Sequence, residues 1–221
     1  MFSYRFRFHF RFVCFVFYNV TYYNWPCGKK NPIEMDEKKC TVDELQNVIT
    51  APTGGLTMLP STAYDEVYPN LYLGEDTIAL SRVGLRNLGI THLLNVAQGN
   101  SKYHVNANDV MYHKVNIEYM GLEATDQMNF DLSIYFEKGA NFIETGLKSG
   151  GKVMVNCKQG VSRSATLVLA YLMIKCHMTA QEAVRTVRAK REIDPNEGFL
   201  QQICDLNETL KKAGHFDITS S

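Results

Sequence analysis

The chain has 221 residues, of which 45% are hydrophobic and 21% charged, and its formal net charge at pH 7 is zero. This length and composition are typical of one globular domain with a full core, and the balanced charge argues against bulk attraction to nucleic acid. The six cysteines form no C-x-x-C pair and no cluster with histidine, so the sequence predicts neither a metal site nor a disulfide framework and favours a reducing compartment.

The first 34 residues differ in composition from the rest of the chain. They carry five Lys and Arg against one Glu, a net charge of +4, and twelve of the first 25 residues are aromatic. Their longest apolar run, 12–18, is shorter than the about 20 residues that a membrane-spanning helix needs. We expect residues 1–35 to be a poorly ordered extension, with contact of residues 1–25 with a membrane surface as the less favoured alternative. A domain over 36–215 and a short tail at 216–221 would follow.

Apolar periodicity and turn signals predict strands that alternate with helices, with helices dominating late in the chain. Thr41 and Glu44 are placed to form a capping box, and Pro69 indicates a strand at a sheet edge. The expected helices are 40–50, 76–89, 132–151, 164–176, 179–192 and 196–214, and the expected strands are 66–74, 90–97, one beginning at 114, and 152–156. Helix 164–176 is apolar on every face and should be buried. These elements predict an α/β fold, a single domain with a mainly parallel central sheet flanked by helices.

The segment CKQGVSRS, residues 157–164, lies between a predicted buried strand and this apolar helix. Backbone N–H groups of such a loop, together with the positive end of the helix, can hold a phosphate and lower the pKa of the Cys157 thiol. Arg163 can bind two phosphoryl oxygens at once through its planar guanidinium. Gly160 allows close backbone approach, and two serines supply hydroxyls near the thiolate. The candidate phosphate-binding residues are Lys158, Gln159, Gly160, Val161, Ser162 and Arg163.

The order C-x-x-G-x-S-R-S resembles the active-site loop of cysteine-dependent protein tyrosine phosphatases, and Ser-Arg-Ser is typical of their dual-specificity branch. The similarity runs from about Thr41 to Gly214, through GITHLLNVA, FDLSIYFEKGANFIE, TLVLAYLMIK and REIDPNEGFLQQICDLNETL. It is strongest to the small atypical dual-specificity phosphatases of the vaccinia H1-related type. The resemblance implies a protein tyrosine phosphatase-like fold and a cytoplasmic or nuclear enzyme that needs no cofactor. Its partners would be phosphorylated proteins, with MAP kinases among them.

The resemblance also implies a role for each matching residue in a two-step reaction. Cys157 would form a phosphocysteine, and Asp126 would protonate the leaving group and later activate water. Arg163 would hold the charge of the transition state, and Ser164 would help the thiolate leave. Two residues would have supporting roles: Asn196 would fix the loop, and Arg191 would receive a second phosphate on a doubly phosphorylated substrate.

Two positions depart from the family pattern. Asn156 stands where the family usually has His, and Asn never carries charge, so we expect a less favoured thiolate and slower turnover. Val161 replaces an aromatic residue, which changes the expected pocket rim. Asn156 also motivates the alternative of a weak or inactive pseudophosphatase that binds phosphoproteins. A phosphatase of inositol lipids or RNA 5′ ends ranks third, because the loop carries only one lysine besides Arg163.

Overall fold

The structure is a computed structural model that describes residues 39–217. The extension predicted at 1–35 therefore lies outside the described residues, as does most of the predicted tail. Within 39–217, none of the helices combines the length and the apolar character that crossing a bilayer would require.

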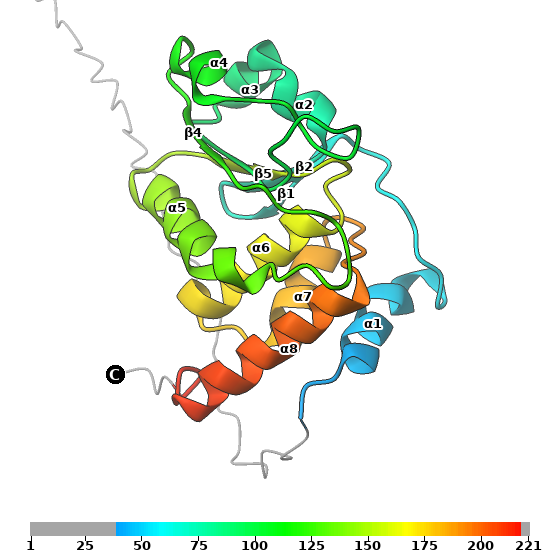
Figure 1. Cartoon of the computed structure of the whole chain (residues 1–221). Helices are drawn as coiled ribbons and strands as arrows, with labels where there is room; N and C mark the ends of the chain where they lie inside the picture. Colours follow the sequence, from blue (N-terminus) through cyan, green and yellow to red (C-terminus); the bar gives the residue numbers. More distant parts are fainter. Residues whose placement is uncertain (1–38, 218–221) are drawn as a thin grey trace, which may run out of the picture. The chain divides into compact units, whose positions relative to one another are not determined.

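A five-stranded sheet forms the centre of the described domain (Figure 1). Its strands stand in the order β1-β2-β5-β3-β4 and comprise β1 (Tyr64–Tyr68), β2 (Leu71–Gly74), β3 (His92–Asn95), β4 (Glu118–Gly121) and β5 (Val153–Asn156). The pairs β2–β5, β5–β3 and β3–β4 are parallel, and only the edge strand β1 pairs antiparallel, with β2. The predicted α/β class with a mainly parallel sheet is confirmed.

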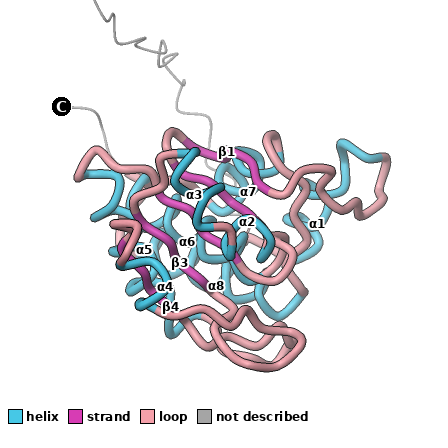
Figure 2. Tube along the Cα trace, turned by 90° about the horizontal axis from the view of Figure 1, so that it is seen from above, coloured by secondary structure: helices cyan, strands magenta, loops and turns pink. Residues whose placement is uncertain are grey.

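Helices cover both faces of this sheet (Figures 1 and 2). One face carries α2 (Asp76–Leu80), α3 (Arg82–Leu88) and α4 (Asp109–His113). The other carries α1 (Val42–Thr50), α5 (Phe136–Lys148), α6 (Arg163–Cys176), α7 (Ala180–Arg188) and α8 (Glu197–Lys212), with short 3-10 turns at Ala51–Thr53 and Ser133–Tyr135. Two separate apolar clusters form the core, because the buried strands present side chains to both layers.

Helix α6 is the buried helix that its composition predicts. Every residue from Arg163 to Ile174 is buried, and the helix packs on β2 and β5 and against α5, α7 and α8. Each large apolar side chain removed from water in this way contributes about 1.5–3 kcal/mol to folding. This packing fixes the start of α6, and with it the loop that joins β5 to α6.

Two predicted elements are each divided in the structure. The strand expected over 66–74 is a hairpin, because Asn70 adopts a left-handed backbone with φ 59° next to Pro69, which has no N–H to donate to a sheet. The helix expected over 76–89 is interrupted at Ser81, whose ψ of 87° is not helical and whose Oγ accepts from the Gly84 N–H at 3.1 Å. The predicted end at Gly89 is confirmed.

The structure differs from the prediction at two further places, one side-chain pairing and one short helix. Glu44 donates its N–H to Thr41 Oγ1 at 3.3 Å, but its carboxylate accepts from Gln181 Nε2 instead of completing the capping box. Helix α4 falls where no element was predicted, since five residues give too little periodicity to recognise. It is held by Tyr112, which stacks on Tyr119 with ring centroids 4.9 Å apart.

Candidate active site

The Cys157 loop, residues 157–163, joins the carboxyl end of the central strand β5 to α6. The carbonyl groups of residues 158–162 all accept hydrogen bonds: Lys158 O from Asp76 N–H (3.2 Å), Gln159 O from Arg191 Nη2 (3.3 Å), Gly160 O from Arg191 Nε (3.0 Å), Val161 O from Asp194 N–H (2.8 Å) and Ser162 O from Thr166 N–H (2.9 Å). Each peptide N–H points opposite to its C=O, so the loop's N–H groups turn toward its interior. No backbone carbonyl of residues 39–217 accepts from the N–H groups of 159–162. The loop is therefore a ready cradle for an anion.

Gly160 is required by the shape of this cradle. Its φ is 67°, and a Cβ built there would lie 2.5 Å from the backbone C and O of Gly74 at the end of β2. The sequence predicted that the Gly160 backbone approaches the ligand closely, and the structure shows a close approach to the neighbouring strand β2. A side chain at this position would push the loop away from the sheet.

Cys157 lies at the base of the cradle and is 1% exposed. Burial acts to raise the pKa of the thiol, but the Arg163 guanidinium and hydrogen bonds from Ser164 and from the Gly160 N–H outweigh it, so the pKa is lowered. The Ser164 hydroxyl donates to Cys157 Sγ at 3.1 Å. The site thus favours a thiolate, the nucleophilic form of cysteine.

Arg163 is buried beside the thiol, and one of its three side-chain nitrogen atoms makes no hydrogen bond among the described residues. Its Nη1 donates to Ala124 O at 3.0 Å and its Nη2 to Tyr103 O at 3.1 Å. Its Nε is buried without a hydrogen-bond partner among the described residues and lies 3.4 Å from Asp126 Oδ2. A buried donor without a partner is rare in proteins and is a mark of a site that takes a ligand.

Asp126 stands over the cradle, on the loop that follows β4. Its Oδ1 accepts from Ser162 Oγ at 2.8 Å and from Asn196 Nδ2 at 3.0 Å. Asn196 is also the N-cap of α8, where its Oδ1 accepts from the Phe199 N–H at 3.0 Å. The structure therefore places Asn196 on the carboxylate of Asp126, while the backbone of Asp194 contacts the loop itself.

Arg191 lies behind the loop, and its side chain is fully buried. Besides the carbonyls of Gln159 and Gly160, it donates to Thr62 O at 3.0 Å and to Asp65 Oδ2 at 2.7 Å. The expectation that Arg191 receives a second phosphate does not fit this placement, because its donors are engaged and no surface of the side chain is open. No sequence pattern pointed to Asp65, which pairs with Arg191 from the edge strand β1.

Asn156, at the end of β5, is fully buried. Its Nδ2 donates to Cys157 O at 3.2 Å and to Asn95 Oδ1 at 3.4 Å, and its Oδ1 has no partner among the described residues. Asn95 is the register partner of Asn156 on β3. Asn156 thus holds the backbone at Cys157, and no hydrogen bond runs from its side chain to the sulfur.

Two other loop residues have placements that the sequence did not settle. Lys158 pairs through Nζ with the carboxylate of Asp76, in the first turn of α2, which ties the loop to that helix. Val161 is 6% exposed and does not line the cavity over the loop.

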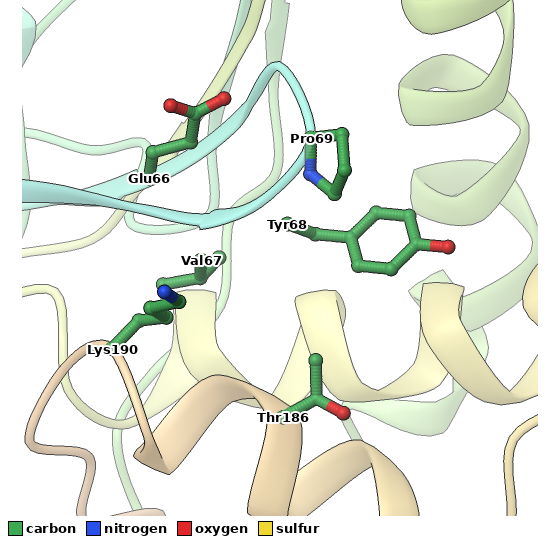
Figure 3. Close-up of a pocket in the computed structure, with 6 residues that line it drawn as sticks. All are labelled: Glu66, Val67, Tyr68, Pro69, Thr186 and Lys190. Carbon is green, nitrogen blue, oxygen red and sulfur yellow. The ribbon is translucent and has the colours of Figure 1, made fainter. Parts of the chain in front are cut away.

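Two surface cavities of similar size show why chemistry and not volume identifies the site. One, of about 380 Å³, lies over the loop and is lined by Tyr103, His104, Thr125, Asp126, Gln127, Lys158, Gln159 and Arg163. The other, of about 400 Å³, lies between the β1–β2 hairpin and α7 and is lined by Glu66, Val67, Tyr68, Pro69, Thr186 and Lys190 (Figure 3). Only the first contains residues predicted to act on a phosphate.

Comparison with known proteins shows which family has this sequence and fold. The family model described as dual specificity phosphatase, catalytic domain, matches residues 71–209. Human dual specificity protein phosphatase 26 is 47% identical over 149 residues, which cover 67% of this chain and 69% of the relative, and the mouse protein matches equally well.

Solved structures agree with this match. Human DUSP28 superposes with a TM-score of 0.60 at 26% identity, covering 71% of this chain and 99% of its own. The human tyrosine phosphatase-like serine/threonine/tyrosine-interacting protein superposes with a TM-score of 0.60 at 29% identity, covering 67% of this chain and 97% of its own.

Proposed function

The chain belongs to the dual specificity phosphatase family and is a protein phosphatase, and we propose that it hydrolyses both phosphotyrosine and phosphoserine or phosphothreonine through a phosphocysteine intermediate. The observation that carries this proposal is the anion cradle with Cys157 at its base. A thiol whose pKa is lowered beside inward-facing N–H groups suits nucleophilic attack on the phosphorus of a bound phosphate.

In the first step, Cys157 Sγ attacks phosphorus as the bond to the leaving oxygen breaks. The N–H groups of the loop and Arg163 Nε, which makes no hydrogen bond within residues 39–217, are available to the phosphoryl oxygens. Asp126 is held over the cradle by Ser162 and Asn196, where its carboxyl group can give a proton to the leaving oxygen.

In the second step, water attacks the phosphocysteine, and Asp126, now ionised, takes a proton from that water. The thiolate of Cys157 leaves with its charge stabilised by the Ser164 hydroxyl, which is 3.1 Å from the sulfur. The products are inorganic phosphate and the regenerated thiolate, so the enzyme needs no metal or organic cofactor for either step.

Substrate identity and cellular location extend the proposal beyond the chemistry. Phosphorylated proteins are the substrates, and we include MAP kinases among them on the family resemblance alone. We propose that the protein is cytoplasmic and also enters the nucleus, on the family resemblance and because free cysteines are typical of a reducing compartment.

The test is hydrolysis of a phosphotyrosine peptide and of a matched phosphothreonine peptide, with release of phosphate as the readout. We expect Cys157→Ser to abolish turnover, and Asp126→Asn to slow it by about 10²–10⁴-fold, the usual contribution of a general acid. Rapid quenching of Ser164→Ala during turnover should trap phosphate on the protein, because this variant loses the hydroxyl that stabilises the departing thiolate. Tight peptide binding without turnover in the unmodified protein would instead mean a phosphoprotein-binding pseudophosphatase, the role that Asn156 raised.

A further inference from the structure

Two cysteines far apart in the sequence lie in contact outside the active site. Cys40 directly precedes the N-cap of α1, and Cys204 lies on α8, which packs beside α1 (Figure 1). Their sulfur atoms are 3.0 Å apart, although 164 positions separate them in the chain. Both side chains are buried, at 3% and 0% exposure, and both are free thiols. The catalytic chemistry uses neither of them.

Cys40, the slightly exposed member of this pair, borders a surface cavity. A cavity of about 190 Å³ opens beside Cys40 and is lined by Lys39, Cys40, Thr41, Val42, Asp43 and Gln201. The hydrogen bond between the two sulfur atoms stabilises the thiolate of the sulfur that accepts it, and it shifts the two pKa values apart, that of Cys204 downward and that of Cys40 upward. One sulfur of the pair therefore ionises more readily than its partner, which is how thiol oxidation begins.

We propose that Cys40 and Cys204 form a redox-sensitive pair that closes to a disulfide bond when the protein meets hydrogen peroxide. One thiolate attacks a peroxide oxygen, the O–O bond breaks, a sulfenic acid forms, and the departing hydroxide takes up the proton that the thiol had released and becomes water. The second sulfur then attacks the sulfenic sulfur, the S–S bond forms, the S–O bond breaks, and hydroxide leaves as water. Two thiols and one peroxide thus give one disulfide and two waters.

The cross-link would join the segment before α1 to α8 and so close a loop that spans most of the domain. Neither cysteine lines the cavity over the Cys157 loop. The disulfide bond would therefore act mainly on the stability of the domain and not on the active site. A disulfide that closes so long a loop removes much conformational freedom from the unfolded chain. For a domain of this size we expect a rise in Tm of about 10 °C on oxidation.

The experiment uses the full chain carrying Cys157→Ser, so that the nucleophile cannot react with peroxide. After peroxide treatment and alkylation of the remaining thiols, peptide mapping should find the Cys40 and Cys204 peptides linked, with the loss of two hydrogen atoms. Thermal unfolding should show the higher Tm, and dithiothreitol should reverse both changes.

Variants at three cysteines keep the test decisive. Cys204→Ala should abolish both the linked peptide and the rise in Tm, and Cys40→Ala should do the same if the first variant fails to fold. Cys176→Ser is the matched control, since this half-buried thiol on α6 contacts neither member of the pair, and it should respond like the parent. The proposal is overturned if both cysteines are alkylated after peroxide treatment, or if Cys204→Ala shows the same rise in Tm.

Discussion

Arg191→Met tests whether this arginine supports the Cys157 loop or binds a second phosphate. Methionine keeps the apolar bulk but removes every donor, including those to Gln159 O, Gly160 O and Asp65 Oδ2. Breaking a buried ion pair costs about 3–5 kcal/mol, and we take the lower end because the side chain of Asp65 is 25% exposed to solvent. A loss of about 3 kcal/mol corresponds to a fall in Tm of about 6–12 °C for a chain of this size.

The assay combines thermal unfolding with kcat/KM for a singly phosphorylated peptide. We expect kcat/KM to fall by about tenfold or more, because the two loop carbonyls lose the group that turns them outward and the cradle loses its shape. Arg188→Met is the matched control. Arg188 is also nearly buried and donates to Ile49 O at 2.7 Å, but it does not touch the loop, so this variant should lose stability without the same loss of kcat/KM.

The opposite result would refute this reasoning. If Arg191→Met kept its Tm and its activity on singly phosphorylated peptide, and raised KM only for a doubly phosphorylated one, Arg191 would bind the second phosphate after all. A double-mutant cycle with Asp65→Asn adds a second check. The two changes should cost less together than the sum of their separate effects, since they remove partners of one interaction.

Three further changes test the loop and its thiol. Ser164→Ala removes a hydrogen bond to a charged sulfur, which is worth about 1.5–3 kcal/mol. Breakdown of the phosphocysteine should therefore slow by about 10–100-fold, and pre-steady-state assays should show a burst. Because the same change raises the pKa of Cys157, the acidic limb of the kcat/KM profile should move to higher pH. Gly160→Ala should lower activity more than tenfold in the same assay, because its Cβ would meet the backbone of Gly74, and unchanged activity would disprove the rigid cradle. Asn156→His should lower the pKa of Cys157 further and move the acidic limb to lower pH, and an unmoved limb would show that Asn156 does not weaken the thiolate.

Sequence patterns alone were enough to predict the family and the class of fold. The spacing from Cys157 to Arg163 between a β-rich run and an apolar run defines a strand, a loop and a buried helix, because such local patterns have few alternative structures. The short elements were beyond this reach. The hairpin turn at Asn70 and the break at Ser81 each depend on one residue's backbone conformation, which periodicity does not reveal.

The contacts that hold the active-site residues in place could be seen only in the folded structure. Contacts such as Asp65 with Arg191, or Asp126 with Asn196, join residues 126 and 70 positions apart, and no local pattern specifies such pairs. The same is true of Cys40 and Cys204. No sequence pattern pairs them, and the packing of α1 on α8 brings them into contact. These distances depend on how the whole core packs. The contacts that hold the active site therefore form only when the sheet and its helix layers come together.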